Sequence, residues 1–156
     1  MLTQVFLILD MAGSMQANKQ ASIDACNEFV EGLKADPHTK DFLFSLAVFN
    51  SNIGLERVVD GVQLDRAPKL DHEHYQPTGA TPLYDAMWQS MNLLEGHQGQ
   101  VLFIVQTDGE ENSSRIATRQ QIVERVAEKT AAGWQFVYLG CDIDAMQQGG
   151  ELGIAA

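Results

Sequence analysis

Short, continuous apolar runs alternate along the chain with longer stretches in which apolar residues recur every three or four positions. An apolar run of about four to eight residues is typical of a buried strand, and the wider spacing is typical of a helix with one buried face. The apolar runs predict strands over Thr3–Leu9, Phe42–Phe49, Leu55–Val62, Val101–Thr107 and Gln135–Gly140. The helical spacing predicts helices over Gln16–Leu33, Pro82–Glu95 and Thr118–Ala131, and the start of a further helix at Asp144.

This alternation of strands and helices predicts an α/β fold, doubly wound, with a mainly parallel sheet and helices on both faces. The turn Asn50–Asn52 is too short for a parallel crossover, so the strands on either side of it are expected to be antiparallel. The polar segment Asp65–Gly79 predicts a surface loop. A chain of 156 residues is expected to form a single domain, residues 1–156.

Acidic and hydroxyl side chains occur where two of the predicted strands end and where one helix begins. Asp10 and Ser14 follow the first strand, Asp108 follows the strand Val101–Thr107, and Thr81 directly precedes Pro82. Open α/β sheets place their ligand sites at the carboxyl ends of the strands. Oxygen ligands of this kind suit a hard divalent cation such as Mg²⁺.

Together these segments resemble the von Willebrand factor type A (VWA) family and its metal-ion-dependent adhesion site (MIDAS), whose pattern is Asp-x-Ser-x-Ser, a distant Thr and a distant Asp. Asp10, Ser14, Thr81 and Asp108 match that pattern, and the segment 107–114 resembles a bacterial or phage branch of the family. The resemblance implies a Rossmann-like fold with one antiparallel edge strand. Family members commonly continue with one more strand and helix, so this chain is expected to be either a minimal member of the family or a shortened one.

The resemblance further implies a Mg²⁺ or Mn²⁺ site in which Ser14 and Thr81 are hydroxyl ligands, while Asp10 and Asp108 bind directly or through water. Position 12 departs from the pattern, because an alanine stands where the family has its first serine. A methyl group cannot bind a metal, so Ala12 is expected to weaken the site. Ala12 is either the natural residue of a degraded site or a replacement of serine that abolishes metal binding.

Each candidate ligand also has a structural interpretation. Ser14 and Thr81 could cap the helices that follow them, and Asp108-Gly109 could form only a turn. Asp10 is the hardest to explain in this way, since an acid that ends a buried strand is costly without a partner.

Two further groups of residues are expected to be solvated. Glu110-Glu111 is interpreted as an exposed acidic loop, with a role in cation or partner preference as the alternative. His72-Glu73-His74 is interpreted as an exposed loop rather than a transition-metal site. The two cysteines, Cys26 and Cys141, are interpreted as small thiols that are partly buried.

The excess of acidic residues in the chain disfavours some classes of binding partner. The chain has 21 Asp and Glu against 10 Lys and Arg, a formal net charge of -11. This balance argues against nucleic acid and against an anionic membrane surface as partners. No apolar run approaches the length of a membrane span and the N-terminus has no signal-peptide pattern, so the expected location is cytoplasmic.

The resemblance implies a non-enzymatic, metal-dependent adaptor module that binds a carboxylate of a partner protein, and ATPases are among the partners of such adaptors. The alternative is a Mg²⁺-dependent phosphotransfer enzyme of the haloacid dehalogenase-like type. That type requires a second Asp two residues after the first, where this chain has Ala12. The sequence therefore favours the interaction module over the enzyme.

Overall fold

A computed structural model describes residues 2–107, 111–140 and 149–154 of the chain. It contains one five-stranded sheet with the strand order β3-β2-β1-β4-β5. The strands are β1 Gln4–Asp10, β2 Leu43–Asn50, β3 Gly54–Gln63, β4 Val101–Gln106 and β5 Gln135–Leu139. β1, β2, β4 and β5 are parallel to one another, and β3 pairs with β2 in the antiparallel direction.

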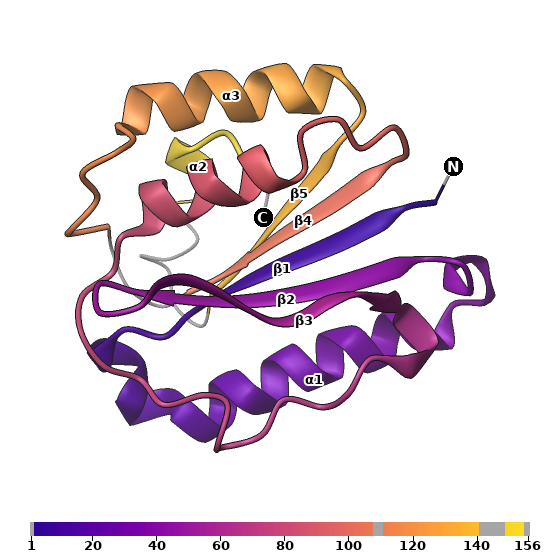
Figure 1. The fold of residues 1–156 in the computed structure, drawn as a ribbon, viewed down its shortest axis with the longest axis horizontal. Helices are drawn as coiled ribbons and strands as arrows, with labels where there is room; N and C mark the ends of the chain where they lie inside the picture. The colour runs from indigo at the N-terminus through magenta and orange to yellow at the C-terminus, as the bar shows by residue number, and fades with distance from the viewer. Residues whose placement is uncertain (1, 108–110, 141–148, 155–156) are drawn as a thin grey trace.

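Within the described residues, three α-helices of more than ten residues cover the sheet, and short 3-10 helices lie before α1 and in two of the loops. The α-helices are α1 Lys19–Ala35, α2 Leu83–Leu93 and α3 Arg119–Ala131. The 3-10 helices are η1 Gly13–Asn18, η2 Pro37–Thr39 and η3 Leu64–Arg66. α1 lies on one face of the sheet, and α2 and α3 lie on the other face (Figure 1). The predicted fold class, including the antiparallel edge strand β3, is confirmed.

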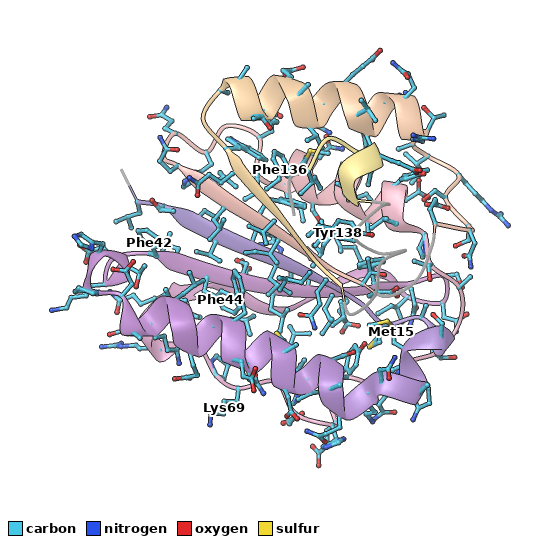
Figure 2. The ribbon with its side chains drawn as sticks, turned by 180° about the vertical axis from the view of Figure 1, so that it is seen from behind. Met15, Phe42, Phe44, Lys69, Phe136 and Tyr138 are labelled. Atoms are coloured by element: carbon cyan, nitrogen blue, oxygen red, sulfur yellow. The ribbon has the colours of Figure 1, made fainter. Side chains whose placement is uncertain are left out.

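A separate hydrophobic core lies on each face of the sheet, because the side chains of a strand point alternately to its two sides. Phe44 of β2 and Met15 of η1 belong to the core beneath α1. Tyr138 of β5 belongs to the core beneath α2 and α3, where Phe136 packs against it. Figure 2 shows these four side chains from behind the view of Figure 1.

The strand register brings the candidate site together at one edge of the sheet. Leu9 pairs with Gln106 of β4, and Asp10 pairs with Phe49 of β2. The carboxyl ends of β1, β2 and β4 therefore lie side by side, at the left in Figure 1. The prediction that the strand containing Val101 lies beside the first strand is confirmed.

Two sequence predictions require correction. The helix expected over Gln16–Leu33 begins as an α-helix only at Lys19, after the 3-10 helix η1. The N-cap residue of η1 is Ala12 and that of α1 is Asn18, and neither side chain forms a capping hydrogen bond. A helix start without such a cap leaves backbone donors that side chains do not satisfy. The loop expected over Asp65–Gly79 also contributes to the core, since Tyr75 is completely buried within it.

The remaining predictions concern the last helix, the two cysteines and a membrane span. The helix start at Asp144 and the cysteine at position 141 fall within 141–148 and lie outside them. Cys26 is buried on α1, and burial raises the pKa of its thiol to about 12. No helix in the described part of the chain is both long and apolar enough to cross a bilayer.

Candidate functional site

The carboxylate of Asp10 lies at the centre of the sheet edge and is fully buried. Its Oδ1 accepts a hydrogen bond of 2.8 Å from the backbone N–H of Ala12, and its Oδ2 accepts one of 2.6 Å from the hydroxyl of Thr107. Both donors are uncharged, so they stabilise the carboxylate without neutralising it. Thr107 follows β4 directly, and the pairing of β1 with β4 places it level with Asp10.

The main chain after Asp10 is held by contacts from two other segments, the end of β2 and the loop that precedes Thr81. The Tyr75 hydroxyl donates to the carbonyl of Asp10 at 2.6 Å, and the Asn50 amide donates to the carbonyl of Met11 at 3.1 Å. The backbone N–H of Gly13 donates to the carbonyl of Gly79 at 2.9 Å, and that of Thr78 donates to Met11. These contacts place the loop that carries Ser14 against the loop that leads to Thr81.

Ser14 and Thr81 both lie at this edge, and neither caps a helix. Ser14 is exposed and lies in η1, whose N-cap residue is Ala12. Thr81 is 2% exposed, and the N-cap residue of α2 is Pro82, without a side-chain hydrogen bond. Neither hydroxyl forms a hydrogen bond with another described residue. The capping interpretation of both residues is therefore wrong.

The backbone of Thr81 is fixed by Asn112. The N–H of Thr81 donates to the Asn112 side-chain oxygen at 2.8 Å, and the N–H of Asn112 donates to the carbonyl of Thr81 at 3.1 Å. This reciprocal pair of hydrogen bonds joins the start of α2 to the segment that follows β4. The predicted ligand Asp108 comes shortly after β4 in the sequence. Asp108 itself lies outside the described residues.

Glu111 has a structural role that the sequence did not predict. Its carboxylate accepts hydrogen bonds from the N–H of Tyr84 at the start of α2 and from the N–H groups of Ser113 and Ser114; the Ser114 hydroxyl also bonds to it. An anion is favourable at a helix N-terminus, where backbone N–H groups lack partners. Burial raises the pKa of Tyr84, and the nearby charge of Glu111 raises it further. The interpretation of Glu111 as a solvated loop residue is wrong, and Glu110 lies outside the described residues.

Asp85 of α2 forms a second anchor for the same segment. Its carboxylate accepts hydrogen bonds of 2.8 to 2.9 Å from the consecutive N–H groups of residues 115, 116 and 117. The segment 111–117 is thereby attached to the first turn of α2 at two points.

The histidines of the loop behave as predicted. His72, Glu73 and His74 are all exposed. Nδ1 of His74 lies 2.6 Å from a carboxylate oxygen of Asp71. Within the described residues, no three His, Cys, Asp or Glu side chains come together as a group that could hold a metal.

The groups at the sheet edge fit a weak site for a hard cation. Mg²⁺ accepts oxygen ligands and commonly keeps several waters. Ser14 and Thr81 offer hydroxyl oxygens that form no hydrogen bond within the described residues, and Asp10 offers carboxylate oxygens, which are strong ligands of hard cations. Ala12 offers a methyl group that is 1% exposed, where the MIDAS pattern has a hydroxyl.

Comparison with known proteins supports the fold. No protein-family model and no curated protein matches this sequence. Among solved structures, the chain is similar to the pilus adhesin SpaC of Lactobacillus rhamnosus GG, with 12% identity, a TM-score of 0.70, and coverage of 97% of this chain and 26% of that one. It is also similar to VWA2, an ArnB paralog of Sulfolobus acidocaldarius, with 17% identity, a TM-score of 0.57, and coverage of 89% and 34%.

A third similar structure is proximal thread matrix protein 1 from the mussel byssus, described with a zinc-occupied MIDAS motif. The identity is 14%, the TM-score is 0.58, and the similarity covers 89% of this chain and 35% of that one. At these identities the likeness establishes a VWA-like fold and nothing finer. The chain spans about a third or less of the length of these three proteins.

Proposed function

We propose that this chain is a non-enzymatic interaction module that binds Mg²⁺ or Mn²⁺ at the carboxyl edge of its sheet and uses the ion to hold a carboxylate of a partner protein. In this proposal Ser14 and Thr81 are hydroxyl ligands, and Asp10 acts directly or through water. Asp108 completes the set from outside the described residues. The observation that carries the proposal is that the hydroxyls of Ser14 and Thr81, at the same sheet edge as the buried Asp10, form no hydrogen bond within the described residues.

The chemistry of these groups favours the capture of an external acid. Hydroxyls are neutral ligands, so a divalent ion held by two hydroxyls and few carboxylates keeps much of its charge. A carboxylate from a partner protein can then complete the coordination shell. Without the ion, the acids at this edge of a chain with net charge -11 would repel the same carboxylate. The similar structure with a zinc-occupied MIDAS motif supports a divalent metal as the bridging group.

Metal titration of the ¹⁵N-labelled chain tests the proposal. Mn²⁺ broadens the NMR signals of nearby nuclei, so the amides of residues 12–14 and 80–82 should broaden first. Ala12→Ser adds one hydroxyl ligand, and a ligand worth about 1.4 kcal/mol would raise the Mn²⁺ affinity about tenfold in calorimetry. Thr81→Val should reduce the binding of Mn²⁺, whereas Thr130→Val, at the exposed end of α3, should leave it unchanged.

Two results would contradict the proposal. One is broadening that is spread over the acidic surface and not centred on the sheet edge. The other is an Ala12→Ser variant that binds Mn²⁺ no more tightly than the original chain. A partner complex that forms equally well in EDTA would show that the metal is not the bridging group.

A further inference from the structure

A cavity of about 380 Å³ lies beside the sheet edge, between the start of α2, the β2–β3 turn and the segment 113–116. Its lining includes Ser51, Pro82, Gln89, Ser113, Arg115 and Ile116. Pro82 directly follows Thr81, and Ser113 directly follows Asn112, which is bonded to Thr81. Consecutive Cα atoms are about 3.8 Å apart, so the cavity and the candidate metal edge share a wall.

Several polar groups in this cavity are not committed to other contacts. The Ser113 hydroxyl oxygen is buried without a hydrogen-bond partner. None of the described residues forms an ion pair with Arg115. The carboxylate of Asp85, which also lines the cavity, already accepts the three N–H groups of residues 115–117. The Ser113 hydroxyl and the Arg115 guanidinium are therefore donors in the cavity that suit a carboxylate.

Exposed apolar side chains flank the same cavity. Ile116 lines it and is 59% exposed, and Ile53 precedes the lining residue Gly54 and is 42% exposed. Large exposed apolar side chains that gather around a concave surface are typical of binding sites, whereas scattered ones carry no such meaning. The floor of the cavity is also partly apolar, through Pro82 and Ala86.

We infer that this cavity binds a short segment of a partner protein in which an apolar side chain stands next to an Asp or Glu. The apolar side chain enters the cavity between Ile116 and the β2–β3 turn, and the acid pairs with Arg115. The contact needs no metal. The inference rests on the proposed function in one respect, that the ligand is a partner protein. It adds a second contact with that partner, beside the metal edge.

Charge and size both favour this ligand. A protein with a net charge of -11 repels acidic segments over most of its surface, and Arg115 provides a local exception at the cavity. Ligand pockets commonly measure about 300–1,000 Å³, so 380 Å³ is room for one or two side chains rather than for a long stretch of chain.

The test uses the blocked dipeptide acetyl-Leu-Asp-amide as probe, added to the ¹⁵N-labelled chain in EDTA and followed by NMR. Saturable shifts are expected at the amides of Gly54, Ala86 and Ile116. Acetyl-Leu-Asn-amide and the Arg115→Gln variant should each weaken the binding by about two- to fivefold, as expected for a partly exposed ion pair. Arg66→Gln is the matched control, since Arg66 is exposed and lies far from the cavity. It follows the end of β3, which pairs with the start of β2 at the opposite edge of the sheet.

The outcomes separate this inference from the proposed function. Shifts that fail to saturate at the cavity, or that respond equally to both peptides and to both arginine variants, would overturn the inference. If the cavity shifts appear in EDTA and Mg²⁺ adds none at residues 12–14 and 80–82, the inference stands and the metal-dependent function fails. If the shifts appear only at the metal edge and only with Mg²⁺, the proposed function stands and the inference fails.

Discussion

Thr107→Val provides a direct test of how the buried carboxylate at the sheet edge is stabilised. The substitution removes the hydroxyl that donates to Asp10 Oδ2 at 2.6 Å and changes the side-chain volume little. Valine is β-branched like threonine, so the extended backbone remains favourable. Because Asp10 and Thr107 are both at most 1% exposed, water cannot easily replace the lost donor.

The expected loss follows from the charge of the acceptor. A hydrogen bond to an ionised group contributes about 1.5–3 kcal/mol to stability, so Thr107→Val should destabilise the fold by about 2 kcal/mol at neutral pH. For a chain of this size, 1 kcal/mol shifts the unfolding midpoint by about 2–4 °C, which gives a shift of roughly 4–8 °C.

Urea and thermal unfolding in EDTA measure the effect, and Thr130→Val is the matched control. The Thr130 hydroxyl bonds only to a carbonyl of its own helix and the residue is exposed, so its loss should change stability by less than about 0.5 kcal/mol. A double-mutant cycle with Asp10→Asn isolates the coupling between the two side chains. If Thr107→Val costs no more than Thr130→Val, Thr107 does not stabilise Asp10 and the description of the site is wrong.

Three further predictions concern the loops and α1. The hydrogen bond that the His74 ring donates to the Asp71 carboxylate raises the pKa of His74, and the same contact lowers the pKa of Asp71. Their contact should therefore stabilise the loop fully between pH 3.8, the usual pKa of a carboxyl group, and pH 6.5, the usual pKa of histidine. This stabilisation should be lost as the pH rises through the raised pKa of His74. It should also be lost as the pH falls through the lowered pKa of Asp71. In NMR titrations Asp71→Asn should lower the midpoint of His74, whereas Asp65→Asn should not. Glu111→Gln should speed hydrogen exchange at the start of α2, because it removes a charged acceptor from those amides; unchanged exchange would refute the anchor. Burial raises the pKa of Cys26 to about 12, so peptide-level mass spectrometry should find it unlabelled by a thiol reagent at pH 8 in the folded chain and labelled in urea.

The sheet was predictable from sequence because its signals are local and strong. Buried parallel strands need apolar side chains on both faces, so each appears as a continuous run. The short turn Asn50–Asn52 then determined the antiparallel edge. The capping box of Thr118 and Gln121 at the start of α3 likewise depends on residues three positions apart, and the structure forms it.

The partners of the candidate site were not predictable in the same way, because they come from distant segments. Tyr75 lies 65 positions from Asp10 in a polar loop, and only its aromatic ring among charged and polar neighbours indicates that it is a buried residue. The sequence pattern at Thr107 predicts only the end of a strand. The role of Glu111 depends on the position of α2, which no local pattern specifies. Sequence spacing therefore identified candidate ligands, while the groups that orient them required the fold.

Two of the donors to the buried Asp10 carboxylate, a backbone N–H and a hydroxyl, carry no charge. They offset part of the cost of burying the acid and add no positive charge beside it. If Asp10 is part of a metal site, as proposed, neutral donors of this kind would preserve the negative potential that attracts a divalent ion. In contrast, Arg115, which forms no ion pair with another described residue, lines the cavity on the other side of the shared wall. Negative potential at the sheet edge and positive charge at the cavity would give one acidic partner segment two different contacts, one through the metal and one without it.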